Sequence, residues 1–120
     1  MRPEISHLMR HFYNDLEDHD SVKTDRPPIR GVESNVYFVN HSHMETTVAD
    51  GSSKQNEYEA KYVVALAIYL VKQGYRPDQI TVLVMYLGQR QCIARQTKSI
   101  KLLQGLRTTV RVLLSTSRCV

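Results

Sequence analysis

The chain has 120 residues, of which 42% are hydrophobic and 23% charged. This composition excludes a disordered chain, and the length allows one domain with one core but not two. The net charge of +4 permits nucleic-acid binding without requiring it. No apolar run reaches the length of a membrane helix and no signal peptide is visible, so we expect a cytoplasmic or nuclear location without membrane contact.

The first forty residues are predicted to contain one helix and one strand. Residues 3–14 form the helix, because Pro3 suits its first turn and an apolar stripe follows at helical spacing. The stripe consists of Ile5, Leu8, Met9 and Phe12. The polar stretch 16–31 is expected to be a loop with room for one further helical turn. Residues 35–40 are rich in β-forming side chains and are predicted to be a strand.

A longer helix is predicted at 56–73, after a polar loop at 41–55. Its start, Asn56-x-x-Glu59, has the form of a capping box with Asn in place of Ser or Thr. Apolar residues cover nearly its whole circumference, so we expect it to be largely buried. Gly74 is expected to end it as a C′ glycine.

Strands and helices alternate over the rest of the chain. The predicted elements are a strand at 80–85, a helix at 88–103 and a strand at 108–114, followed by the unpatterned tail 115–120. This alternation is typical of an α/β fold, with βαβ units and a parallel sheet flanked by helices. Ligands of such sheets bind at the carboxyl ends of the strands.

The candidate binding site therefore follows the strand at 80–85. Tyr86 could stack on a base, Gly88 would let the backbone approach a phosphate, and Gln89 offers an amide at a helix start. The alternative is structural, with the tyrosine packed over the sheet edge and the glutamine capping the helix. The residues by themselves favour neither interpretation over the other.

The motifs of an ATP-hydrolysing site are absent from this sequence. No Gly-x-x-x-x-Gly-Lys-Ser/Thr phosphate loop occurs, and no apolar strand ends in an acidic pair that could hold magnesium. The acidic cluster within 15–20 is interpreted as a solvated face.

No metal site is predicted from the histidines or cysteines. His7 and His11 are four residues apart on the predicted helix, a spacing that can chelate zinc, but no third ligand stands at a suitable distance. The pair His41-x-His43 is likewise not predicted to bind a metal. The two cysteines show no metal-binding spacing and are expected to be reduced thiols.

Four short motifs, in this order, resemble a known family. They are Met1-Arg2-Pro3-Glu4-Ile5, Asn56-x-x-Glu59-Ala60, Pro77-Asp78-Gln79-Ile80 and Tyr86-x-Gly88-Gln89. Over about residues 1–105 the chain resembles the second RecA-like domain of superfamily 1 helicases of the Upf-like, DNA2/NAM7-type group, and in particular the NFX-type zinc-finger helicases. The resemblance implies a partial P-loop NTPase (RecA-like) domain at 1–114.

The resemblance also implies a role for the candidate site. Tyr86 and Gln89 match the family's Thr-Pro-Tyr-x-x-Gln motif, which lies near the nucleic-acid and inter-domain cleft. Val84 and Met85 stand where the family has threonine and proline, so the loop departs from the family pattern there. Tyr86, Gly88 and Gln89 are accordingly expected to line the nucleic-acid cleft.

Two further motifs carry over less fully. Arg2 and Pro3 resemble the end of the family's Gln-x-Arg-Met-x-Pro motif and are expected to lie near the nucleotide. The arginine of that motif that reaches the ATP γ-phosphate would precede Met1, so Arg2 is not expected to take its role. Asn56 and Glu59 match a recurrent helix start, for which helix capping is a sufficient explanation.

The resemblance implies a parent protein that is an ATP-dependent RNA helicase. Its second motor domain would close on ATP and Mg bound by the first RecA-like domain, and would contact single-stranded RNA or DNA. This chain lacks the Walker A, Walker B and arginine motifs, so alone it is expected to bind no cofactor and to be inactive. After Val112 it departs from the family pattern, which suggests a truncated fragment. A non-catalytic RNA- or protein-binding module and a non-functional product are the alternatives.

Overall fold

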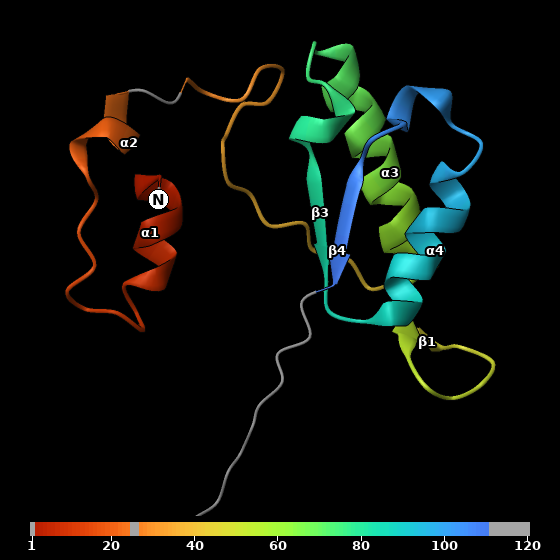
Figure 1. Ribbon diagram of the computed structural model, residues 1–120. Helices are drawn as coiled ribbons and strands as arrows, with labels where there is room; N and C mark the ends of the chain where they lie inside the picture. Colours follow the sequence, from red (N-terminus) through yellow and green to blue (C-terminus); the bar gives the residue numbers. More distant parts are fainter. Residues whose placement is uncertain (1, 25–26, 111–120) are drawn as a thin grey trace, which may run out of the picture. The chain divides into compact units, whose positions relative to one another are not determined.

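The computed structural model of the protein describes residues 2–24 and 27–110 (Figure 1). The chain divides into two compact units, Met1–His41 and Ser42–Val120. The tail 115–120 and the end of the strand predicted at 108–114 lie outside the described residues. No helix in the described part of the chain is long and apolar enough to cross a bilayer.

The first unit contains two short helices, α1 (Pro3–Met9) and α2 (Asp20–Thr24). Pro3 stands in the first turn of α1 as predicted, but the helix ends at Met9 instead of reaching residue 14. The further helical turn expected within 16–31 is present as α2. The strand predicted at 35–40 is wrong, because these residues form bends and coil. A β-forming composition yields a strand only where a partner strand completes its hydrogen bonds.

Polar contacts hold the first unit together. The fully buried Ser6 places its Oγ 2.8 Å from Oδ2 of Asp18, and the same carboxylate oxygen accepts a hydrogen bond of 2.9 Å from Arg10. The side chain of Asp18 is only 5% exposed. The interpretation of the acidic cluster as a solvated face is therefore wrong at Asp18.

The second unit is built around a βαβ arrangement. Its elements are β1 (Thr46–Thr47), β2 (Lys54–Gln55), α3 (Glu57–Lys72), η1 (Pro77–Gln79), β3 (Thr81–Val84), α4 (Leu87–Thr97), η2 (Lys101–Leu103) and β4 (Arg107–Val110). β3 and β4 pair in parallel, with α4 between them in the sequence. The expected loop at 41–55 carries in addition an antiparallel hairpin of β1 and β2. The α/β character predicted from the alternation is thus confirmed.

Both ends of α3 follow the predicted local signals. The side chain of Asn56 caps the helix by accepting the N–H of Glu59 at 3.1 Å. At the other end Gly74 adopts φ 96°, and the N–H of Tyr75 donates to the carbonyl of Leu70 at 3.2 Å. This pattern is the Schellman motif, which requires a left-handed residue at C′ and therefore favours glycine.

The core lies between the strand pair and the helices α3 and α4, which stand on one side of the pair in Figure 1. Its buried members are Ala60, Val64, Ala67, Val84, Cys92, Ile93 and Leu103. The expectation that α3 is buried nearly all round is wrong, since Tyr58, Tyr62 and Tyr69 on its other face are exposed. The helix predicted at 88–103 ends at Thr97 and gives way to the short η2.

Candidate functional site

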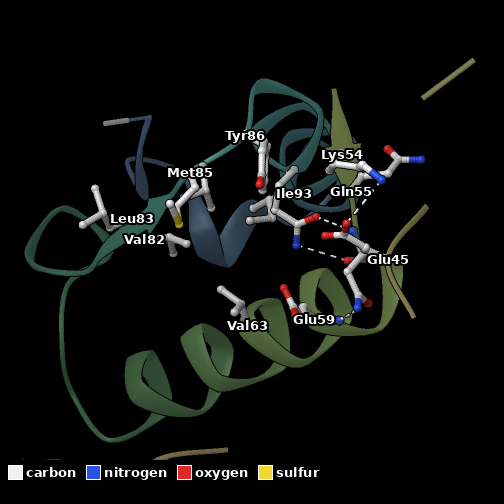
Figure 2. A pocket seen from close by; sticks show the side chains of 13 residues that line it. Glu45, Lys54, Gln55, Glu59, Val63, Val82, Leu83, Met85, Tyr86 and Ile93 are labelled. Carbon is white, nitrogen blue, oxygen red and sulfur yellow. Dashed lines mark hydrogen bonds and ion pairs between the residues drawn. The ribbon is translucent and has the colours of Figure 1, made fainter. Parts of the chain in front are cut away.

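A cleft of about 320 Å³ opens at the carboxyl end of β3 (Figure 2). Figure 2 shows Tyr86 and Met85 on one side of it, and Glu59 and Val63 of α3 on the opposite side. The hairpin of β1 and β2 contributes Lys54 and the preceding segment contributes Glu45. The cleft lies where the sequence placed a ligand site, after a strand of a parallel pair.

Tyr86 occupies the N-cap position of α4 and lines this cleft. Its carbonyl accepts the N–H of Arg90 at 3.2 Å, which begins the helix. The residue is 47% exposed, so its ring is accessible to a ligand. An accessible aromatic face is suited to stacking on a planar group such as a base.

Gln89 lines the same cleft but its amide is already used by the protein. The residue is 8% exposed. Its Oε1 accepts the backbone N–H of Asn56 at 2.6 Å, and its Nε2 donates to the carbonyl of Asn56 at 3.1 Å. The structural interpretation of Gln89, as a glutamine that caps a helix, therefore fits better than a contact with a ligand. The helix start that it caps is that of α3, however, and not that of its own helix α4.

Position 88 requires a glycine because the neighbouring strand β2 passes close to its Cα. A Cβ at this position would lie 2.8 Å from the backbone oxygen of Lys54 and 3.2 Å from Oγ of Ser53. The N–H of Gly88 donates to the same Ser53 hydroxyl at 2.9 Å. The absence of a side chain at Gly88 therefore lets α4 approach the hairpin. The sequence had suggested instead that it lets the backbone approach a phosphate.

Asn56 joins three segments of the second unit. Besides capping α3 and pairing with Gln89, it donates from Nδ2 to the carbonyl of His43 at 2.9 Å. The ring of His43 in turn stacks on Tyr58 with centroids 3.7 Å apart. The structure confirms the predicted cap, but the N–H of Asn56, which a capping box would pair with the side chain of Glu59, donates to Gln89 instead. The bonds to Gln89 and His43 were not predicted from the sequence.

The hairpin is the part of the site that sequence reasoning missed. Asp50-Gly51 is a typical hairpin-turn pair and was the available signal. Gly51 adopts φ 71° at the last position of a turn in which its N–H donates to the carbonyl of Val48 at 2.8 Å, and the N–H of Ser52 donates to the carboxylate of Asp50. The strands that flank this turn are only two residues long, too short for an alternating pattern to reveal them.

The charges that line the cleft are two carboxylates and one ammonium group, from Glu45, Glu59 and Lys54. Lys54 Nζ lies 3.3 Å from a carboxylate oxygen of Glu45, which offsets its charge. A phosphate inside the cleft would meet net negative charge. The cleft is therefore better suited to the uncharged ring of a ligand than to its phosphate.

Arg2 and Pro3 lie in the first unit. Pro3 begins α1, and the guanidinium of Arg2 donates to the carbonyl of Pro27. Their place near a nucleotide stays a prediction. Among residues 2–24 and 27–110, no three or more His, Cys, Asp or Glu side chains gather closely enough to hold a metal ion.

Comparison with known proteins identifies the family. Residues 1–113 match the family model described as "AAA domain". The chain is 44% identical over 111 residues to the mouse NFX1-type zinc finger-containing protein 1, and 44% identical over 112 residues to the human protein of that name. Each match covers 92% of this chain but 6% of the relative.

A third relative carries a helicase name. The Schizosaccharomyces pombe protein "Helicase required for RNAi-mediated heterochromatin assembly 1" is 38% identical over 97 residues, covering 79% of this chain and 9% of the relative. The chain thus spans less than a tenth of each of these relatives. No solved structure matches it. The family match over nearly the whole chain, together with these relatives, shows that the chain belongs to the AAA domain family, in the DNA2/NAM7-like group of superfamily 1 helicases.

Proposed function

We propose that residues 1–114 are part of the second, RecA-like motor domain of an ATP-dependent RNA helicase-like protein. The helicase name of the S. pombe relative and the order of the four motifs support this assignment. The β3–α4–β4 unit is the kind of parallel unit from which such domains are built. ATP, Mg and the first RecA-like domain would be supplied by the rest of the parent, with Arg2 and Pro3 on the nucleotide side.

The observation that carries the proposal is the half-exposed Tyr86 at a cleft after a parallel strand. In this assignment the Tyr86 ring stacks on a base of single-stranded RNA or DNA, a contact that contributes about 1–3 kcal/mol per base. The net negative lining keeps phosphates outside the cleft, where the chain's overall charge of +4 attracts them.

Binding of a labelled single-stranded RNA, followed by fluorescence anisotropy, tests this role. Tyr86→Ala is expected to raise the Kd about tenfold, because one stacking contact is lost. Tyr62→Ala is the matched control, since Tyr62 is also exposed but does not line the cleft. Equal Kd values for both variants would overturn the proposal. A log Kd that does not change with log salt would exclude phosphate contacts.

Turnover of ATP separates the motor assignment from its alternative. The 120-residue chain is expected to show none above background, with or without RNA, because it contains no phosphate-binding loop. In the parent protein, Tyr86→Ala is expected to lower RNA-stimulated turnover. Unchanged stimulation in the parent would instead favour a non-catalytic RNA- or protein-binding module.

A further inference from the structure

Hydrogen bonds between Asn56 and Gln89 join two motifs that lie 33 residues apart in the sequence. We propose that Gln89 is a positioning residue, which acts through Asn56 to hold the cleft around Tyr86 and does not itself contact the ligand. The identity of that ligand rests on the proposed function. The effect of Gln89 on the cleft does not depend on that ligand and can be measured in the free protein.

The hydrogen bonds of Asn56 leave little freedom in this pair. Its N–H donates to Gln89 and its carbonyl accepts from Gln89 and from the N–H of Ala60. Its side chain accepts from Glu59 and donates to His43. Asn56 is 6% exposed, so loss of the Gln89 amide would leave its N–H both buried and unpaired.

The pair fixes the first turn of α4, which begins directly after Tyr86. That turn is held at two points, by Gln89 on the start of α3 and by Gly88 on Ser53 of the hairpin. Tyr86 lines the cleft from the position just before α4, and Glu59 lines it from α3. If Gln89 released Asn56, the two helix starts could separate, and the Tyr86 ring would lose its fixed place.

A direct contact between Gln89 and a ligand is less favourable. To reach a ligand, the amide would have to leave both groups of Asn56. The N–H of Asn56 would then lose its partner in a buried setting, while its carbonyl would keep the N–H of Ala60, and the new contact must offset that cost.

The substitution Gln89→Glu makes the pair titratable. Either form of the introduced carboxyl can accept the N–H of Asn56, but only the protonated form can donate to its carbonyl. Burial and the carboxylates of Glu45 and Glu59 are expected to raise the pKa of this carboxyl, while the hydrogen bond from the Asn56 N–H and the charge of Lys54 oppose them. The bond to the Asn56 carbonyl is therefore expected to be lost at about pH 8, where a carboxylate oxygen would face that carbonyl oxygen, and to be restored at about pH 5.5.

The first measurement uses the free protein. In Gln89→Glu, the NMR signals of the Tyr86 ring and of the Asn56 amide are expected to move from their wild-type positions at about pH 8 and to return at about pH 5.5. A residue that only contacted the ligand would leave the Tyr86 signals of the free protein unmoved, and that result would overturn the inference. Comparison with wild type at each pH removes every effect of pH that does not depend on position 89.

The second measurement is the Kd for single-stranded RNA, given as the ratio of variant to wild type at each pH. For Gln89→Glu this ratio is expected to be about tenfold at the higher pH and to approach one at the lower. Gln91→Glu is the matched control, because Gln91 is exposed on the same helix, and its ratio is expected to stay near one. Gln89→Asn keeps the amide but shortens its reach, so its ratio is expected to be raised at both pH values.

The outcomes separate this inference from the proposed function. If Gln89→Glu and Gln89→Asn bind RNA as wild type does while Tyr86→Ala loses binding, the inference fails and the proposed function stands. If wild type binds no RNA, the proposed function fails and the Tyr86 signals of the free protein decide the inference. If Gln89→Glu does not fold at the higher pH, the Kd ratio of Gln89→Asn decides it, and a ratio of one would overturn it.

Discussion

The two units of the chain carry similar apolar patterns but bury them differently. Every buried apolar residue among those described lies in the second unit, whereas Ser6 is the one buried residue in the described part of the first. Leu8 and Phe12 follow a helical stripe in the first unit, yet they are 54% and 80% exposed. A stripe thus predicts a helix from local periodicity, but its burial depends on a second surface to pack against.

The contacts that stabilise each unit differ accordingly. In the described part of the first unit they include the buried hydroxyl of Ser6 and the ion pair of Arg10 and Asp18. In the second they are an apolar core and the Asn56–Gln89 pair, which close-packed helices can protect from water. We therefore expect substitutions in the second unit to cost more stability than equivalent substitutions in the first.

The largest difference is expected between Ile93→Ala and Leu8→Ala. Ile93 is 1% exposed at the centre of the core, so its truncation leaves a cavity and should lower the free energy of unfolding by about 2–5 kcal/mol. Leu8→Ala removes an exposed side chain and should change it by less than about 0.5 kcal/mol. Urea denaturation followed by circular dichroism measures both. Equal losses would show that the first unit has a core of its own.

The next largest effect is expected from Gly88→Ala. The added methyl group would approach the backbone oxygen of Lys54 to 2.8 Å, so helix and hairpin must separate. A loss of about 1–3 kcal/mol is expected, as for other overpacked sites. Gln91→Ala, on the exposed side of the same helix, is the control and should be nearly neutral. A stable Gly88→Ala variant would mean that the hairpin can move away from α4 at little cost.

A smaller and local effect is expected from Ser6→Ala. The substitution removes the buried hydroxyl that bonds Asp18, at a cost of about 1 kcal/mol. Hydrogen exchange of the α1 amides should become faster while exchange of the α3 amides stays unchanged. Faster exchange in both helices would show that the two units unfold together and not independently.

Most elements of the second unit were predictable because their signals are local. The cap at Asn56, the stop at Gly74 and the β-branched run that became β3 each act within a few residues. The strand predicted at 35–40 was wrong for the opposite reason, since a strand needs a partner that composition does not specify.

The candidate site was predictable only in part. The position of Tyr86 at the end of β3 followed from the strand pattern. The partners of Gln89 and Gly88 could not be predicted, because Asn56 and Ser53 are 33 and 35 residues away. A glutamine at a helix start has the same sequence signature whether it bonds a ligand or a buried backbone.

The smallest expected effect comes from the exposed ion pair at the start of α3. Lys61 Nζ lies 2.9 Å from the carboxylate of Glu57, and this hydrogen bond, with the charge of Lys61, lowers the pKa of Glu57 below its ordinary 4.5. A carboxyl whose pKa is lowered on folding adds stability above its unfolded pKa and loses it as the pH falls through the folded value. Glu57→Gln should therefore lower the melting temperature slightly at about pH 7 and not at about pH 3.

A similar pair in the first unit provides the control for this prediction. The hydrogen bond from Lys23 lowers the pKa of Asp20 in the five-residue α2, which contributes no buried residue. Asp20→Asn should leave the melting temperature of the second unit unchanged at both pH values, because the pair lies outside its core. If both substitutions lowered that melting temperature equally, the two units would share one unfolding transition. They would then differ in how much apolar surface they bury but would not unfold independently.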